Sequence, residues 1–199
     1  MKFHPILFST PMVKAIKIGQ KFQTRRTKGL EKITNHYFQS MVHHYSGRFT
    51  FVENGNFNPT NEDVVVVECP YGKVGDVLWV RETFVKYSVN GKNGKEVEYE
   101  FKADDSPIKF RWRPAIHMPK EACRIFLKIT DIRLEQLQNI SRGDAMAEGC
   151  PFPNMAKEVS PVEWFKGLWQ SINGEDSWNS NPWVWVISFE RIEKPENFI

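Results

Sequence analysis

The first thirty residues carry apolar and polar positions in an order that predicts a strand, a short helix and a second extended segment. The apolar run Ile6-Leu7-Phe8 is typical of a strand. Thr10 is predicted to cap the following helix, and Pro11 suits its first position. Gly19 is predicted to end the helix in a left-handed conformation, so that residues 21–26 leave the turn as extended chain.

The middle of the chain predicts short strands separated by turns. Residues 36–42 are predicted to form a second short helix, and residues 54–60 form a loop rich in Asn, Gly and Pro. The β-branched run at 64–67 predicts a buried strand. A turn at Gly72–Asp76 leads into a strand over 77–82, and residues 88–97 are the tip of a hairpin.

The C-terminal third contains the clearest helix signals. Ser141 and Ser160 are each followed three residues later by an acidic residue, which is the pattern of a capping box. Residues 124–130 alternate with a period of two, as a strand does, and residues 182–189 are apolar on both faces, as a central strand is. Five or six strands with few helices predict an α+β protein built on a small mixed barrel.

Composition places the chain among globular proteins. Its 199 residues are enough for one domain. With 26% charged residues, its composition is that of a globular protein rather than of a disordered one. No apolar run approaches the roughly 18 residues that cross a bilayer, and the N-terminus lacks a secretory apolar region. A cytoplasmic protein without membrane association is therefore expected. The net charge of +3 permits contact with nucleic acid without requiring it.

The three cysteines, Cys69, Cys123 and Cys150, lie far apart and form no metal-binding motif. We expect buried thiols. The sequence predicts no metal and no cofactor.

The candidate chemistry follows Gly19. Lys21, Thr24 and Arg26 place an amine, a hydroxyl and a guanidinium within six residues. A buried lysine with a lowered pKa can activate a hydroxyl nucleophile, and an arginine can hold a polar or anionic substrate. Lys21 and Thr24 converge only if the segment turns.

Aromatic residues offer packing and stacking roles. Trp164 and Trp169 have the helical positions of core residues. The remaining candidates lie on predicted strands, where at least one could stack on a base: Trp79, Trp112, Trp183 and Trp185.

Several short motifs follow one another along the chain. The first is Pro11–Ile16, continued by Gly19-x-Lys21-x-x-Thr24-x-Arg26. The others are Gly75–Arg81, Trp112–Pro119, Ala147-Glu148-Gly149, Ser171–Gly174 and Trp185–Phe189. In this order the motifs resemble ASCH (activating signal cointegrator homology) domains, and the chain as a whole resembles their longer bacterial and prophage members.

The resemblance implies a PUA-like fold, a mixed β-barrel flanked by short helices and often associated with RNA or modified nucleosides. It also implies one elaborated domain over 1–199, with inserted segments near 28–62 and 86–110. A compact bacterial member type is an amidohydrolase on acylated cytidine, with matching catalytic positions at Lys21, Thr24 and Glu148. Thr24 would be the nucleophile and Lys21 its base.

Five further residues are candidates for substrate binding: Arg26, Trp79, Arg81, Tyr99 and Trp112. Arg26 could instead pair with Asp76 or Glu82, and the aromatic residues could simply pack. The leading interpretation is an N4-acylcytidine amidohydrolase whose partner is a modified nucleoside or RNA. A noncatalytic RNA-binding module and a metal-independent ribonuclease are the alternatives.

Overall fold

The computed structural model describes residues 1–31, 33, 37–40, 47–53, 64–91, 94–107, 109, 111–151 and 159–198. Its centre is a five-stranded sheet in the order β1-β6-β9-β10-β2, where β1 runs parallel to β6 and the other neighbours are antiparallel. The strands are β1 (Phe3–Leu7), β2 (Gln23–Arg26), β6 (Val77–Arg81), β9 (Phe126–Gln136) and β10 (Trp183–Ile192).

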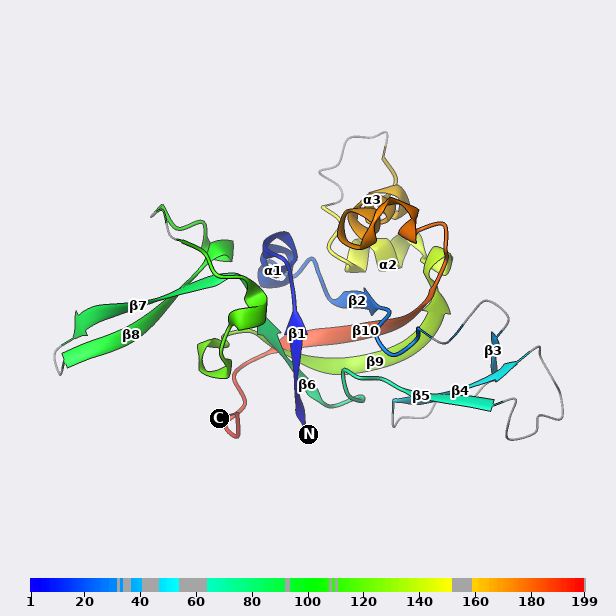
Figure 1. Cartoon of the computed structure of the whole chain (residues 1–199), viewed down its shortest axis with the longest axis horizontal. Coiled ribbons are helices and arrows are strands. Elements are labelled where there is room, and N and C mark those ends of the chain that lie inside the picture. Colours follow the sequence, from blue (N-terminus) through cyan, green and yellow to red (C-terminus); the bar gives the residue numbers. More distant parts are fainter. Residues whose placement is uncertain are drawn as a thin grey trace.

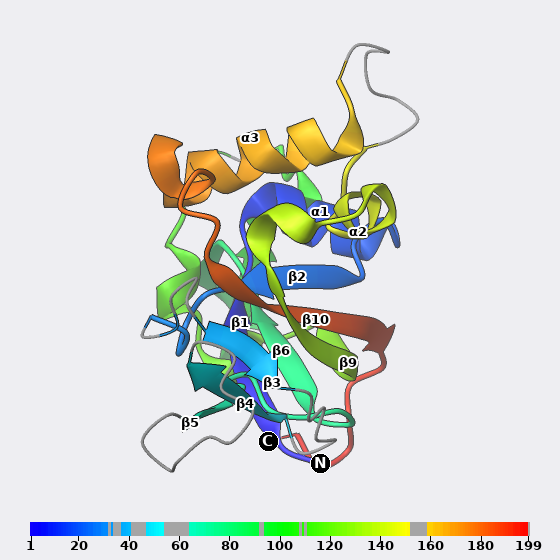
Figure 2. The same ribbon diagram turned by 90° about the vertical axis from the view of Figure 1, so that its right-hand side faces the viewer.

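Three α-helices lie together beside the β2 edge of this sheet (Figures 1 and 2). They are α1 (Thr10–Lys17), α2 (Arg142–Ala147) and α3 (Pro161–Asn173). Short 3-10 helices connect the elements: η1 (Lys102–Asp104), η2 (Ala115–His117), η3 (Lys120–Ala122), η4 (Leu137–Asn139) and η5 (Glu175–Ser177).

Two smaller sheets extend from opposite ends of the central sheet (Figure 1). One contains β3 (Tyr37–Ser40), β4 (Arg48–Glu53) and β5 (Val64–Glu68); the other is the hairpin of β7 (Phe84–Gly91) and β8 (Gly94–Phe101). Most of these strands fall within the segments near 28–62 and 86–110. That the whole chain is one elaborated domain stays a prediction.

The central sheet is strongly curved, and its two outer strands approach each other. The Arg26 guanidinium of β2 donates from Nη2 to the Leu7 carbonyl at the end of β1, at 2.8 Å. In the described residues the strand ladder stops at β1 and β2, so the barrel is left open there. The predicted α+β class is confirmed.

The core lies between the curved sheet and the elements that cover it. Its fully buried members include Val13 of α1, Val80 of β6, Ile129 of β9 and Trp185 of β10. Trp185 meets the ring of Phe49 edge-on, with centroids 5.3 Å apart, and so joins the small β3-β4-β5 sheet to the central one.

Several predicted elements are confirmed. Ser141 and Ser160 accept hydrogen bonds from the main-chain N–H groups of Asp144 and Glu163, as capping residues do. Gly19 has a φ of +74° just after α1. The 182–189 segment becomes β10, which is paired on both sides.

Three predictions were wrong. The N-cap of α1 is Ser9 rather than Thr10, which is already helical. Residues 37–40 of the predicted 36–42 helix form a strand, because pairing with β4 outweighs a weak helical pattern. The strand at 64–67 is not fully buried: Val67 packs in the core, whereas Val66 points to the opposite face and is 54% exposed.

The predicted loop at 54–60 lies outside the described residues. Among the helices that the structure does describe, none is long and apolar enough to span a lipid bilayer.

Candidate functional site

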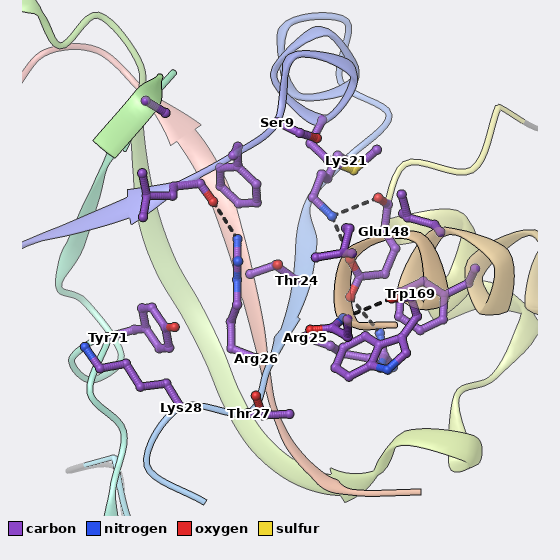
Figure 3. A pocket seen from close by; sticks show the side chains of 18 of the residues that line it. Ser9, Lys21, Thr24, Arg25, Arg26, Thr27, Lys28, Tyr71, Glu148 and Trp169 are labelled. Carbon is purple, nitrogen blue, oxygen red and sulfur yellow. Dashed lines mark hydrogen bonds and ion pairs between the residues drawn. The ribbon is translucent and has the colours of Figure 1, made fainter. Parts of the chain in front are cut away.

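A cavity of about 490 Å³ lies where the end of β1, the start of α1, strand β2, the end of α2 and the face of α3 meet (Figure 3). Its polar side contains Lys21, Thr24, Arg25, Arg26 and Glu148. Its apolar side is formed mainly by Phe8, Met12, Phe165, Leu168, Trp169 and Ile172. All three predicted catalytic residues therefore lie on one cavity.

The turn after α1 brings Lys21 and Thr24 to the same cavity. The left-handed Gly19 ends the helix, and Lys21 then pairs with Glu148 in an isolated antiparallel bridge. Strand β2 begins two residues later and carries Thr24 into the cavity (Figure 3). Gly149 has a φ of +99°, and a Cβ there would lie 3.2 Å from the Lys21 Cβ. Glycine at position 149 thus permits the close approach of the segments that contain Lys21 and Glu148.

Lys21 and Glu148 form a fully buried ion pair. Lys21 Nζ lies 2.6 Å from Glu148 Oε2 and donates a second bond to the Glu148 main-chain carbonyl at 2.8 Å. The two side chains are 2% and 4% exposed. The pair needs both partners, because a lone charge at this depth would be strongly unfavourable.

Arg25 holds the other oxygen of the Glu148 carboxylate. Its Nη1 lies 3.1 Å from Glu148 Oε1, and its Nε and Nη2 donate to Glu135 Oε1 at 3.0 and 2.6 Å. Its guanidinium also lies 5.6 Å from the ring centroid of Phe165 on α3. Glu148 is therefore oriented by a cation on each side.

Thr24 is 3% exposed and lines the cavity. Among the residues that the structure describes, none engages its hydroxyl in a hydrogen bond. Figure 3 shows the side chain pointing between Arg26 and Glu148. A buried hydroxyl that is left free in this way is available to a ligand.

Burial lowers the pKa of two cavity cations, Lys21 and Arg26. Desolvation lowers the pKa of Lys21, an effect that the Glu148 carboxylate opposes and the charges of Arg26 and Arg25 reinforce. Desolvation likewise lowers the pKa of Arg26. Arginine remains charged at neutral pH, whereas a lysine whose pKa falls gains access to its neutral, basic form.

The other predicted substrate-binding residues do not line this cavity. Trp79 lies against Phe198, with ring centroids 6.2 Å apart. Arg81 donates to the main-chain carbonyls of Met118, at 3.1 Å, and Ile116. Tyr99 donates to Glu121 at 3.1 Å on the hairpin side of the molecule.

Trp112, the last of these candidates, is partly buried in the connection that follows the hairpin. The proposed pairing of Arg26 with Asp76 or Glu82 is not seen: Asp76 accepts from the Lys2 main chain and approaches His4, and Glu82 pairs with Arg124.

Sequence reasoning missed several cavity residues. Arg25 is not among the predicted site residues, and Trp169 is predicted only to pack in the core, yet both line the cavity. Tyr71 and Ser9 also line the cavity. These residues reach the cavity because the sheet is curved, and no local sequence pattern predicts that placement.

The predicted buried thiols are confirmed: Cys69, Cys123 and Cys150 are buried and form no disulfide. Burial raises the pKa of Cys69 to about 12 and that of Cys123 to about 11. In the part of the chain that the structure describes, no group of three or more His, Cys, Asp or Glu side chains is placed to hold a metal ion.

The fold and the site define an α+β protein whose curved sheet carries a buried Lys–Thr–Glu constellation. No protein-family model matches the sequence, and no curated protein matches it either. Among solved structures, an ASCH domain from Lactobacillus crispatus is similar, with a TM-score of 0.42, 12% identity and coverage of 97% of this chain and 81% of that chain.

Proposed function

We propose that this protein is an amidohydrolase of the ASCH type that removes an acyl group from the exocyclic nitrogen of cytidine. The observation that carries the proposal is the free Thr24 hydroxyl on a buried cavity that also holds the Lys21–Glu148 pair. A nucleophile, a base with a lowered pKa and a group that orients the base are the three parts that acyl transfer needs.

The proposed reaction proceeds through an acyl-enzyme. Neutral Lys21 accepts the Thr24 proton as the Thr24 oxygen attacks the acyl carbon. The carbon–nitrogen bond then breaks, and the departing exocyclic nitrogen takes the proton from Lys21, which releases cytidine. Water attacks the threonyl ester with Lys21 again as base, so the free acid leaves and the Thr24 hydroxyl is restored.

The surrounding groups have supporting roles in this reaction. Glu148 holds Lys21 Nζ in place through two acceptors, at 2.6 and 2.8 Å. Arg26 supplies a positive charge that can stabilise the oxygen on which negative charge develops. The cavity size lies within the roughly 300–1,000 Å³ typical of small-molecule sites. Its apolar α3 wall suits the face of a base or an acyl chain.

Deacylation of N4-acetylcytidine by the purified protein tests the proposal. Wild-type turnover is expected, and Thr24→Ala is expected to abolish it while the thermal melt stays close to wild type. Thr24→Ser retains a hydroxyl and is expected to keep partial activity. Thr130→Ala is the matched control, because Thr130 is an exposed strand residue of β9. Full activity in Thr24→Ala would rule out this nucleophile, and an inactive wild type would rule out this substrate.

A noncatalytic RNA-binding role is the second candidate, favoured by an excess of cations at the cavity. Among the described residues, the cavity is lined by four cations and one carboxylate: Lys21, Arg25, Arg26, Lys28 and Glu148. This role predicts RNA affinity that falls with salt, with a shallower slope in Arg26→Gln. Arg25 is not expected to contact an RNA phosphate, because its side chain is 0% exposed and already paired with Glu135 and Glu148.

A further inference from the structure

Arg26 has more hydrogen-bond donors than partners. A guanidinium carries five N–H groups, and in the described part of the chain the only acceptor that Arg26 meets is the Leu7 carbonyl, at 2.8 Å from Nη2. Its Nε is buried without a partner. The guanidinium otherwise lies over the ring of Phe8, 5.1 Å from the centroid.

Within the described residues the Arg26 charge also has no ion-pair partner, although the Glu148 carboxylate acts on it from farther away. Lys21 and Arg25 are each paired with Glu148, whereas no described carboxylate forms an ion pair with Arg26. A partly buried cation without an ion-pair partner is unfavourable, and its buried Nε has no acceptor. Because Arg26 lines the cavity, an anion bound there would supply both the missing charge and the missing acceptors.

Tyr71 faces Arg26 across the same cavity. It follows β5, is partly buried, and in Figure 3 its hydroxyl end lies on the Arg26 side. Burial raises the pKa of Tyr71, so the phenol keeps its proton at neutral pH and acts as a donor. A guanidinium and a phenol offer several hydrogen-bond donors. A phosphate, which has several acceptor oxygens, therefore suits them better than a ligand that presents a single carbonyl oxygen.

We propose that Arg26 and Tyr71 form a phosphate subsite, and that the ligand of this cavity is a phosphorylated nucleoside rather than a free one. The identity of the base rests on the proposed function, whereas the preference for an anion rests on Arg26 and Tyr71 alone. The phosphate can belong to a mononucleotide or to an RNA chain, since both present the same oxygens.

Calorimetric binding of cytidine, cytidine 5′-monophosphate and inorganic phosphate tests the subsite. The wild-type protein is expected to bind the monophosphate about tenfold or more tightly than cytidine, which is the effect of charge-assisted hydrogen bonds. Arg26→Gln is expected to bring this ratio close to one. Tyr71→Phe, which removes only the hydroxyl, is expected to lower it about threefold.

Arg191→Gln is the matched control, because Arg191 is an exposed residue of β10 away from the cavity. Equal wild-type affinities for cytidine and its monophosphate would overturn the inference. An unchanged ratio in folded Arg26→Gln would do the same, and if that variant does not fold, an unchanged ratio in Tyr71→Phe decides against it. A cytidine-containing trinucleotide that binds more tightly than the monophosphate, through Arg26, would support the subsite and assign the phosphate to RNA.

The failure of this inference is distinguishable from the failure of the proposed function. Hydrolysis of acetylcytidine without any preference for the phosphorylated ligand would leave the function standing and remove the subsite. Binding of phosphate that depends on Arg26, without hydrolysis of any acylated cytidine, would support the subsite and remove the amidohydrolase.

Discussion

Lys21 donates to both the carboxylate and the main-chain carbonyl of Glu148, at 2.6 and 2.8 Å, although 127 residues separate the two in sequence. The contact ties the start of β2 to the end of α2, and the adjoining main-chain bridge reinforces it. The same pair therefore stabilises the fold and supplies the cavity with the proposed base and the carboxylate that orients it. Its two roles can be separated by experiment.

Glu148→Gln is expected to destabilise the protein by about 3–5 kcal/mol, because it leaves the buried charges of Lys21 and Arg25 without their shared carboxylate. Urea unfolding measures the loss. Glu190→Gln is the control, since Glu190 is 54% exposed in its pair with Lys128 and such pairs contribute about 1 kcal/mol or less. Equal losses of unfolding free energy in the two variants would show that the buried pair stabilises the protein no more than the exposed pair does.

Lys21 is expected to shape the pH dependence of stability. Its pKa is lowered by burial in the folded protein, so between that value and the unfolded value of 10.5 the unfolded chain binds more protons. The free energy of unfolding of wild type, relative to Lys21→Met, should therefore increase as pH rises through this window. Denaturant unfolding at several values between pH 7 and 10 measures it. A relative stability that falls with pH would mean that the pair with Glu148 outweighs desolvation.

Arg25 is expected to act as a positioning residue. It holds Glu148 Oε1 at 3.1 Å, and its charge contributes to lowering the pKa of Lys21. Removing that charge in Arg25→Gln raises the pKa of Lys21, so the acid limb of the kcat/KM profile for N4-acetylcytidine should move to higher pH. Arg48→Gln, in an exposed pair with Glu68, should leave the profile unchanged. A uniform loss of activity at all pH values would indicate a purely structural role.

Ser160 is expected to stabilise α3 and thereby the apolar wall of the cavity. Ser160→Ala removes the acceptor of the Glu163 N–H and should cost about 1 kcal/mol in the free energy of unfolding. Ser171→Ala, at an exposed position inside the same helix, should be neutral or slightly stabilising, because alanine favours helix. Thermal melts of the two variants compare them directly. A Ser171→Ala loss as large as that of Ser160→Ala would contradict the capping role.

Local signals predicted much of this fold because their causes are local. A side-chain oxygen at Ser141 or Ser160 finds an N–H three residues away, and Gly19 relieves a strained φ whatever surrounds it. The helix expected at 36–42 failed for the opposite reason. Its segment is a strand where the structure describes it, because β4 supplies hydrogen-bond partners that no local pattern reveals.

The sequence by itself determined the α+β class, the capped helices and the central strand β10. It also predicted Lys21, Thr24 and, through motif resemblance, Glu148 as site residues, and their catalytic roles stay a prediction. Only the tertiary structure decided that Arg25 is buried beside Glu148, that Trp79, Arg81, Tyr99 and Trp112 lie away from the cavity, and that Arg26 keeps free donors toward it. Capping and strand periodicity act over a few residues. The depth of a charge and its choice of partner depend on how a curved sheet brings distant segments together.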